Sequence, residues 1–313
     1  MLAIFICLDG GPDQCLSMSK RLNVDAQCVV DARNLIGESP LWSAREAALY
    51  WVDIPAGEIH RWHPASGERK TWTLPAAVGS IGLVARGGLV VAMRSGFHLF
   101  DLQTEKLEFL CRPEPERTTN RLNDGKVSPE GRFWAGTMDE RPQKEAIGSL
   151  YRLNPDHSCA RMAADVKVSN GLAWSPDGRA MYHSDSRGGA IFRYAYEPES
   201  GTIGPREVFA AMQSDWGRPD GGATDAEGCY WSCGVSAGRI NRFSPAGELI
   251  EYVELPVTHP TMPCFGGPDG RTLYVTSLRE NLSATELART PQAGGVFMLE
   301  PRVAGAPAAL YLG

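Results

Sequence analysis

The segment Leu49-Tyr50-Trp51-Val52-Asp53 decides the fold of this sequence, because related segments follow it at regular intervals. Each copy has an aromatic or aliphatic pair followed by small or polar residues. The other copies are Leu89-Val90-Val91-Ala92-Met93, Phe133-Trp134-Ala135-Gly136-Thr137, Met181-Tyr182-His183-Ser184-Asp185, Cys229-Tyr230-Trp231-Ser232-Cys233 and Leu273-Tyr274-Val275-Thr276-Ser277. Their first residues are 40 to 48 positions apart, so the chain contains six repeats of about 45 residues.

Turn sequences stand just before four of the six segments. Proline presets φ for a turn and glycine supplies a positive φ, so each one predicts a hairpin. The turns are Ser128-Pro129-Glu130-Gly131-Arg132, Ser175-Pro176-Asp177-Gly178-Arg179, Asp225-Ala226-Glu227-Gly228 and Gly267-Pro268-Asp269-Gly270-Arg271. The stretches that follow the segments, such as 189–194 and 238–243, alternate apolar and polar residues as a half-buried strand does. No helix of ordinary length is indicated.

Antiparallel units that repeat every 40 to 50 residues are typical of a β-propeller. We therefore predict an all-β chain in which residues 23–313 form one six-bladed β-propeller around a central channel. A strand near residues 27–32 is expected to pair with a strand at 294–300, because a closed ring leaves no exposed edges. Residues 1–22 are expected to be a poorly ordered tail, and Met18 is an alternative start of the native protein.

Composition excludes several classes of protein. The 313 residues are 43% hydrophobic, which is enough for a sizeable core, and the formal charge is −6 with no basic run, so nucleic acid is not expected as a partner. The apolar run 2–8 is too short to span a membrane and lacks the basic residue that precedes a signal sequence. The eight cysteines are scattered and form no C-x-x-C pair, which indicates the reducing cytoplasm.

The innermost strand of each blade lines the axis of a propeller, so equivalent positions of the repeats should meet there. Counting back nine to eleven residues from each segment gives the positions Glu38, Gly79 or Ser80, Asn123, Asn170, Asp220 and Cys264. Four of these six positions are Glu, Asp or Asn. Carboxylates and amides crowded on an axis need a cation, and oxygen ligands suit Ca²⁺, Mg²⁺ or Mn²⁺, with Zn²⁺ and Fe²⁺ also tolerated. We therefore predict a divalent metal site in the channel with open positions for water and substrate.

Simpler interpretations remain for parts of this set. Asn170-Gly171 and Asp220-Gly221 are also hairpin dipeptides, and Glu38 alone would be a surface residue. Lys126 is interpreted as a solvated structural charge, and Arg121 as a partner of Asp124 if it has no substrate role. Strand alternation predicts that Asp124 points away from Asn123.

Three other patterns are not expected to carry chemistry. The G-x-S-x-G match at 234–238 joins two strands rather than a strand and a helix, so a serine hydrolase is not indicated. His60 and His63 face opposite sides of one strand. Cys229 and Cys233 are interpreted as core residues.

The sequence resembles the senescence marker protein, gluconolactonase and regucalcin-like family of sugar lactonases. The resemblance covers residues 34–300 through an ordered set of motifs. They are Gly37-Glu38-Ser39-Pro40, Val52-Asp53-Ile54-Pro55, Asn120-Arg121-Leu122-Asn123-Asp124-Gly125-Lys126, Ala135-Gly136-Thr137-Met138, Ser169-Asn170-Gly171-Leu172, Pro219-Asp220-Gly221, Cys264-Phe265-Gly266-Gly267 and Gln292-Ala293-Gly294-Gly295. The resemblance implies a six-bladed propeller with one divalent ion bound by Glu38, Asn170 and Asp220.

The resemblance also implies that Arg121 and Asn123 contact a sugar lactone and that Asp220 doubles as the general base. Regucalcin-like members have a substrate-contacting glutamate where an ungapped count places Arg141, so either Glu140 substitutes for it or another hydroxyl pattern is recognised.

The function expected from these features is metal-assisted hydrolysis of a sugar-acid lactone, such as gluconolactone, arabinonolactone or xylonolactone, to the free acid. Two alternatives stay open. One is a calcium-binding regulatory propeller without turnover, and the other is a metal-dependent esterase or phosphotriesterase on the same fold. The expected partner is a small-molecule lactone, without nucleic acid or membrane.

Overall fold

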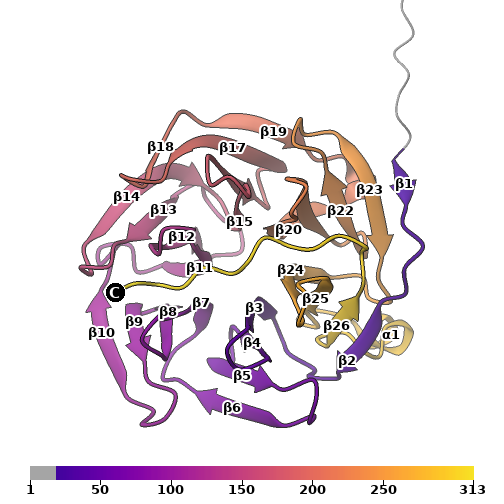
Figure 1. Ribbon diagram of the computed structural model, residues 1–313, viewed down its shortest axis with the longest axis horizontal. Helices are drawn as coiled ribbons and strands as arrows, with labels where there is room; N and C mark the ends of the chain where they lie inside the picture. Colours follow the sequence, from indigo (N-terminus) through magenta and orange to yellow (C-terminus); the bar gives the residue numbers. More distant parts are fainter. Residues whose placement is uncertain (1–18) are drawn as a thin grey trace, which may run out of the picture.

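The computed structural model describes residues 19–313, and these residues form six antiparallel sheets arranged as blades around one channel (Figure 1). The predicted six-bladed β-propeller is therefore confirmed. The first three blades, from the axis outward, are β3 (Gly37–Ser43), β4 (Ala48–Asp53), β5 (Glu58–Trp62) and β6 (Arg69–Thr73), then β7 (Val78–Leu83), β8 (Leu89–Met93), β9 (Gly96–Phe100) and β10 (Leu107–Cys111), then β11 (Asn120–Val127), β12 (Phe133–Asp139), β13 (Gly148–Leu153) and β14 (Cys159–Val166).

The remaining three blades complete the ring. They are β15 (Ser169–Trp174), β16 (Ala180–Asp185) and β17 (Ala190–Glu197), which pairs with both β18 (Thr202–Ile203) and β19 (Glu207–Ala211), then β20 (Arg218–Thr224), β21 (Tyr230–Val235), β22 (Arg239–Phe243) and β23 (Leu249–Glu254), and last β24 (Pro260–Gly266), β25 (Thr272–Ser277), β26 (Val296–Leu299) and β2 (Gln27–Val30).

The ring closes between the two ends of the described chain. β2 pairs antiparallel with β26, with Gln27 opposite Met298 and Cys28 opposite Phe297, as the sequence predicted. Part of the segment predicted as a tail also contacts the propeller, because β1 (Lys20–Arg21) pairs parallel with β23 and the Leu22 N–H donates to Tyr252 O at 2.8 Å. The rest of that prediction concerns residues 1–18, which lie outside the described residues.

The recurring segments form the second strand of each blade, and neighbouring blades cover both of its faces. Every residue of β4, β8, β12 and β21 is buried, and the indole rings of Trp51, Trp134 and Trp231 are fully enclosed. These strands therefore read as continuous apolar runs rather than as alternating ones. The outer strands, such as β10, are partly exposed.

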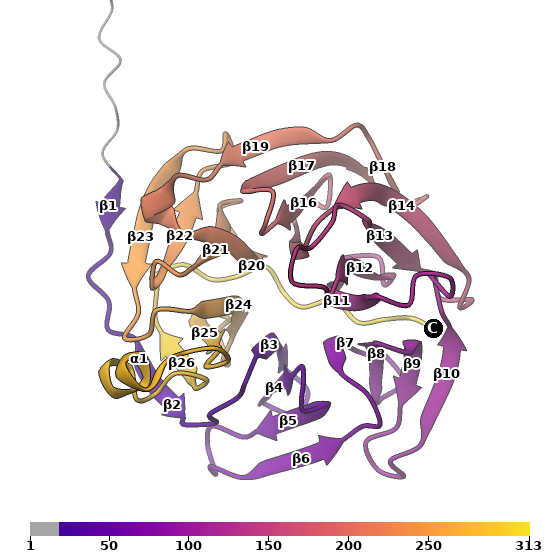
Figure 2. The same cartoon turned by 180° about the vertical axis from the view of Figure 1, so that it is seen from behind.

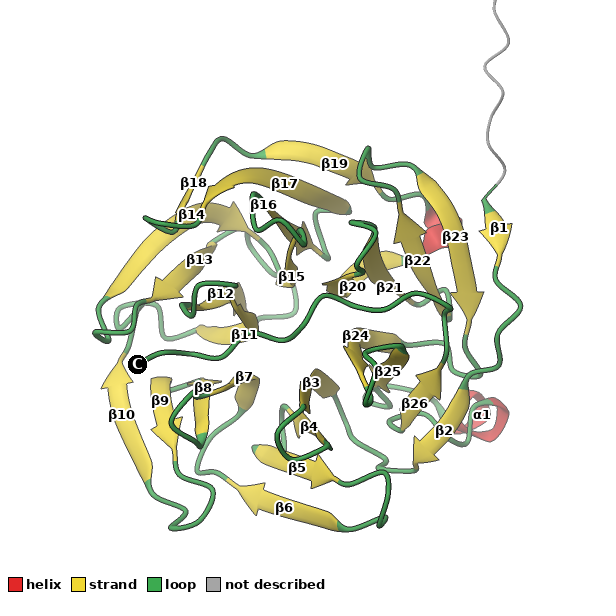
Figure 3. Ribbon diagram, in the orientation of Figure 1, coloured by secondary structure: helices red, strands yellow, loops and turns green. Residues whose placement is uncertain are grey.

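Helix contributes little to the described chain, as Figure 3 shows. It consists of α1 (Ala284–Arg289), whose first turn is capped by Ser283 and Glu286, and of a single 3₁₀ turn, η1 (Ser214–Trp216). Within residues 19–313, neither is long and apolar enough to cross a membrane.

The last residues of the chain cross one face of the propeller, the face toward the viewer in Figure 1. Gly305 donates to Gly270 O in the sixth blade, and Leu312 donates to Gly131 O in the third. The backbone of Tyr311 exchanges hydrogen bonds with Leu83 and Ala85 of the second blade. We call residues 304–312 the C-terminal strap. It covers one end of the channel and leaves the opposite end for the site.

Tyr311 should be the main anchor of the strap, because its side chain is fully buried and its hydroxyl donates to Asn154 O at 2.7 Å. Tyr311→Ala is expected to lower the free energy of unfolding by about 3 kcal/mol or more, through lost burial and a cavity. Tyr311→Phe keeps the ring and should cost only about 1 kcal/mol. Urea unfolding measures both, and equal midpoints for wild type and Tyr311→Ala would show that the strap does not stabilise the propeller.

Candidate metal and active site

The six inner strands share one local irregularity near the start of each strand. The pairing register to the second strand shifts between Glu38 and Leu41 in β3 and between Asn170 and Ala173 in β15. Equivalent shifts occur in β7, β11, β20 and β24. A bulge of this kind bends a strand and re-aims a side chain. Here it directs one residue of each blade toward the axis, a feature that the sequence analysis did not predict.

The residues at this place of the repeat are Glu38, Gly79, Asn123, Asn170, Asp220 and Thr261. Five of them agree with the predicted set, and the sixth is a correction. Thr261 lines the same cavity as Glu38 and Asp220, whereas Cys264 lies three positions further along β24 and lines another cavity. The prediction of Cys264 was wrong because the hairpin of the sixth blade, from Phe265 to Leu273, is one residue longer than the equivalent hairpin from Trp42 to Leu49. Counting back a fixed number of residues from the second strand therefore stops too late in β24.

A cavity of about 480 Å³ is lined by residues at the channel end opposite the strap. Figure 2 shows the propeller from that side, with the strap behind the blades. All six candidate site residues line this cavity: Glu38, Arg121, Asn123, Glu140, Asn170 and Asp220. They come from four different blades. The two carboxylates expected to hold the cation, Glu38 and Asp220, are 6% and 8% exposed, so water reaches them only through the cavity.

Hydrogen bonds link four of these side chains into one chain across three blades. Arg121 Nη1 donates to Asn123 Oδ1 at 2.6 Å, and Asn123 Nδ2 donates to Asn170 Oδ1 at 2.9 Å. Asn170 Nδ2 in turn donates to Asp220 Oδ1 at 2.5 Å and to Ser186 Oγ at 2.8 Å. The Arg121 guanidinium is therefore connected to the Asp220 carboxylate through two amide side chains.

Glu38 and Asp220 form the acidic centre of the site. Burial, followed by the negative charges of Asp220 and Asp124, raises the pKa of Glu38 well above its usual range. Burial and the charge of Asp124 raise the pKa of Asp220 to about 8, although Arg218 opposes the shift. Neither carboxyl forms a salt bridge within residues 19–313. The donor set of two carboxylates and an amide therefore fits a hard divalent cation, which would relieve this repulsion.

Asp124 and Lys126 differ from their predictions. Asp124 does not point away from Asn123, because the bulge in β11 turns both side chains toward β15. Asn123 Nδ2 also bonds Ser169 O, and Asp124 Oδ2 accepts from Leu172 N at 3.1 Å. Lys126 is not a solvated charge, since its ammonium group lies inside the channel and donates to Gly222 O at 2.6 Å.

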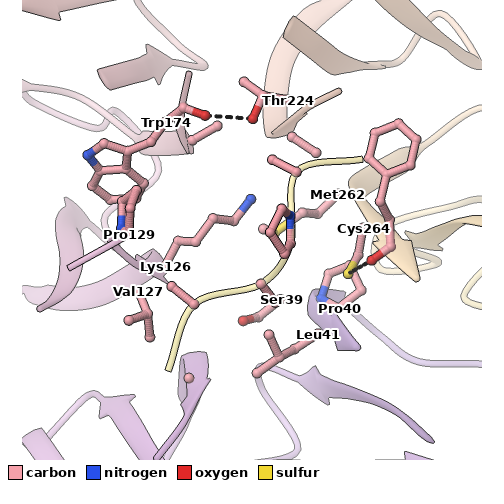
Figure 4. Close-up of a pocket in the computed structure, with 18 of the residues that line it drawn as sticks. Ser39, Pro40, Leu41, Lys126, Val127, Pro129, Trp174, Thr224, Met262 and Cys264 are labelled. Carbon is pink, nitrogen blue, oxygen red and sulfur yellow. Dashed lines mark hydrogen bonds between the residues drawn. The ribbon is translucent and has the colours of Figure 1, made fainter. Parts of the chain in front are cut away.

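Lys126 belongs to a second cavity of about 170 Å³ that lies between the inner strands and the C-terminal strap. Figure 4 shows its side chain pointing into this space, with Ser39, Met262 and Cys264 around it. Burial lowers the pKa of Lys126, and Asp124 opposes that change. This ammonium group interacts electrostatically with Asp124 and with Glu38 of the acidic centre.

Glu140 and Arg141 lie in different surroundings. Glu140 lines the cavity, where Oε1 lies 3.5 Å from Arg121 Nε and Oε2 lies 2.8 Å from Arg94 Nη1. The Arg141 guanidinium instead binds Asp139 and Glu145, away from the cavity. Arg121 is thus paired with Glu140 and Asn123 rather than with Asp124.

A further cluster of potential ligands occurs in the fifth blade, at Asp225, Glu227 and Cys229. Arg242 already neutralises it, because Nη2 lies 2.8 Å from Asp225 Oδ2 and 2.6 Å from Glu227 Oε2. This cluster is a structural ion pair network. Ser236 of the G-x-S-x-G match lies in the tight turn between β21 and β22, with φ of 78°.

The fold and the oxygen-rich cluster at one channel end define a six-bladed propeller with a polar site on its axis. A family model described as the SMP-30/Gluconolactonase/LRE-like region matches residues 36–279. The chain belongs to this family, and the resemblance found in the sequence is confirmed.

Individual relatives agree with this assignment. The chain is 44% identical over 293 residues to a 6-deoxy-6-sulfogluconolactonase of Pseudomonas putida, which covers 93% of this chain and 100% of that protein. It is 36% identical over 282 residues to a regucalcin of Xenopus laevis, covering 88% and 94% of the two chains. The solved structure of a regucalcin from Agrobacterium tumefaciens, described as a calcium-binding protein, has a TM-score of 0.88 and 28% identity, covering 94% of this chain and 99% of that chain.

Among the six equivalent positions of the inner strands, Gly79 is the one without a side chain, and the reason is steric. A Cβ at this position would lie 2.4 Å from Leu122 O and 2.7 Å from Asn123 O, so β7 and β11 approach each other only with glycine here. Gly79→Ala is expected to lower the free energy of unfolding by about 1–3 kcal/mol. Urea unfolding measures this. Gly204→Ala is the matched control, since its nearest neighbour lies at 3.3 Å, and equal losses for both variants would contradict the steric argument.

The raised pKa of Asp220 predicts how the metal-free protein responds to pH. The folded state keeps the proton on Asp220 up to about pH 8, whereas an unfolded aspartate releases it near pH 4, so stability falls as the pH rises between these values. Asp220→Asn cannot ionise. In EDTA at pH 8 it should therefore be more stable than wild type by at least about 1 kcal/mol, and the difference should vanish near pH 4.

Thermal unfolding at both pH values measures the effect, with the exposed Asp215→Asn as control. Excess Ca²⁺ at pH 8 should make wild type more stable than Asp220→Asn, because only the wild-type carboxylate offers the cation a full negative charge. A metal-free Asp220→Asn variant that is less stable than wild type at pH 8 would refute the electrostatic description.

Proposed function

We propose that this protein is a divalent-metal-dependent hydrolase that opens a sugar-acid lactone to the free aldonic acid. The observation that carries the proposal is the pair of buried carboxyls, Glu38 and Asp220, which line an open cavity and form no salt bridge with a described residue. Family membership supports lactone hydrolysis as the reaction. The six free cysteines of the described chain support a reducing compartment, the cytoplasm.

Glu38, Asn170 and Asp220 would hold the metal ion. The Asn170 amide, which now directs Nδ2 at Asp220, would have to turn its oxygen toward a cation, and Asn123 would follow because it bonds the same amide. A divalent cation bound here supplies a Lewis acid that polarises the lactone carbonyl and stabilises the negative charge developing on its oxygen. Ca²⁺, Zn²⁺, Mn²⁺, Mg²⁺ and Fe²⁺ all remain candidates for this oxygen donor set.

Asp220 would act as the general base. It accepts a proton from a water molecule in the cavity as the water oxygen forms a bond to the carbonyl carbon. The bond between that carbon and the ring oxygen then breaks, and the leaving alkoxide takes up a proton, which gives the open hydroxy acid. Hydrolysis consumes one water and needs no oxidant, reductant or serine nucleophile.

Arg121, Asn123 and Glu140 would position the substrate. Arg121 is 9% exposed, and its guanidinium is held by Asn123 Oδ1 at 2.6 Å, so it presents a fixed set of donors to the cavity. Glu140 adds an acceptor for sugar hydroxyls at the rim. Orientation of this kind lowers the entropy cost of reaching the reactive geometry.

The test is lactone opening in a pH-indicator assay with gluconolactone, arabinonolactone, xylonolactone and 6-deoxy-6-sulfogluconolactone. Prolonged EDTA dialysis and Asp220→Ala should each lower the rate at least about hundredfold. Re-addition of single metals should restore the dialysed wild type and identify the ion. Asp215→Ala, which removes an exposed carboxylate, is the control. Full activity after EDTA dialysis, or in Asp220→Ala, would overturn the proposal.

Two outcomes would favour the other functions. Tight Ca²⁺ binding without turnover of any lactone would indicate a regulatory calcium-binding propeller. Hydrolysis of phosphate esters but not of lactones would indicate an esterase or phosphotriesterase on the same fold.

A further inference from the structure

Three basic side chains line the mouth of the site without a carboxylate partner. Lys144, Arg187 and Arg218 all border the cavity that contains Glu38 and Asp220. None of the three forms a salt bridge to a described residue, in contrast to Arg121, which faces Glu140. The proposed lactone hydrolysis does not use them, and a neutral sugar would leave their charges unmatched.

Lys144 lies in the loop between β12 and β13 and is half-buried. Its ammonium group donates to the backbone oxygen of Asp139 at 3.0 Å, which leaves two further N–H donors. The Asp139 carboxylate is unavailable to Lys144, because Arg141 already binds both of its oxygens, at 3.0 and 3.1 Å. The loop thus holds the Lys144 ammonium group at the cavity wall, while the Asp139 carboxylate binds Arg141.

Arg187 lies in the turn between β16 and β17, on the neighbouring blade. The turn is fixed because the backbone N–H groups of Arg187 and Gly188 donate to Asp185 Oδ1 at 3.1 and 3.0 Å. The preceding residue, Ser186, accepts a hydrogen bond from Asn170 at 2.8 Å. Arg187 therefore directly follows Ser186, the residue that bonds Asn170, and its side chain is exposed at the mouth of the cavity.

The two groups are close enough to repel each other. Burial, and then the positive charges of Arg121 and Arg187, lower the pKa of Lys144, while Asp139 and Glu140 offset only part of this. Uncompensated like charges at the wall of a cavity are costly unless an anion binds between them. Arg218, at the start of β20, adds a third positive charge that acts on Asp220.

We propose that Lys144 and Arg187, assisted by Arg218, form a subsite for an anionic group on the part of the lactone remote from the reacting carbonyl. Guanidinium and ammonium donors bind the oxygens of a sulfonate or a phosphate ester through charge-assisted hydrogen bonds. The preferred substrates are then lactones that carry such an anion, rather than neutral sugar lactones. This inference rests on the proposed lactone hydrolysis. The Pseudomonas putida relative, named for a sulfonated lactone, agrees with it.

The turnover experiment compares 6-deoxy-6-sulfogluconolactone and 6-phosphogluconolactone with neutral gluconolactone, in wild type, Lys144→Gln, Arg187→Gln and the double variant. Each single change should lower kcat/KM for an anionic lactone about tenfold, mainly through KM, because one charge-assisted contact is lost. The rate with the neutral lactone should change less than about threefold. Arg193→Gln and Lys106→Gln remove exposed charges elsewhere and serve as matched controls.

A binding experiment tests the subsite without turnover. Calorimetric titration of the acids 6-deoxy-6-sulfogluconate and 6-phosphogluconate should give a Kd at least about tenfold weaker in the double variant than in wild type, with gluconate as the neutral-ended reference. The sulfonate and phosphate arms also distinguish which anion is preferred.

The outcomes separate the two proposals. Equal turnover of neutral and anionic lactones by wild type, or equal losses on both in the double variant, would overturn the subsite and leave lactone hydrolysis intact. A wild type that opens no lactone would refute the proposed function. In that case a Kd for the anionic acids that is unchanged in the double variant would refute the subsite too, and a weakened Kd would support it as an anion-binding site.

Discussion

The structure depends on the register shift that all six inner strands share. Because the blades pack face to face, a regular inner strand would direct alternate side chains to the two neighbouring blades rather than to the axis. The shift lets Glu38, Asn123, Asn170 and Asp220 reach the same cavity from four blades. Gly79 serves the same geometry from the second blade, because its missing side chain lets the backbone of β11 come close.

Charge balance along the channel explains why the site is at one end only. The strap covers the other end, and there the half-buried Lys126 side chain supplies a positive charge beside Asp124. At the open end Glu38 and Asp220 form no salt bridge with a described residue, although Arg121 and Arg218 partly offset their charge, and a bound cation would complete the balance. Under the proposed function, the fold holds a fixed ammonium group where the channel is closed and leaves room for an exchangeable cation where the cavity is open.

The mouth of the cavity carries positive charge, whereas its bottom carries negative charge. Glu38 and Asp220 at the bottom suit a metal ion, and Lys144, Arg187 and Arg218 make the mouth basic. Lys144 and Arg187 stand on loops between strands, where residues can change without disturbing the blades that position the acidic centre, whereas Arg218 is the first residue of β20. Under the proposed function, the inner strands carry the chemistry, and the basic residues at the mouth select the substrate.

The sequence alone determined the number of blades and the ring closure between β2 and β26, because each follows from a repeat of about 45 residues with a local pattern. It also placed Glu38, Asn123, Asn170 and Asp220 at equivalent positions of the repeats, and all four line one cavity. It failed at Cys264 and Asp124, since a hairpin one residue longer and a bulge change which side chain faces the axis. The hydrogen-bond chain from Arg121 to Asp220, the position of Lys126 inside the channel and the basic rim were decided only by the tertiary structure. These features join residues of different blades, and no pattern within a single repeat encodes how neighbouring blades meet.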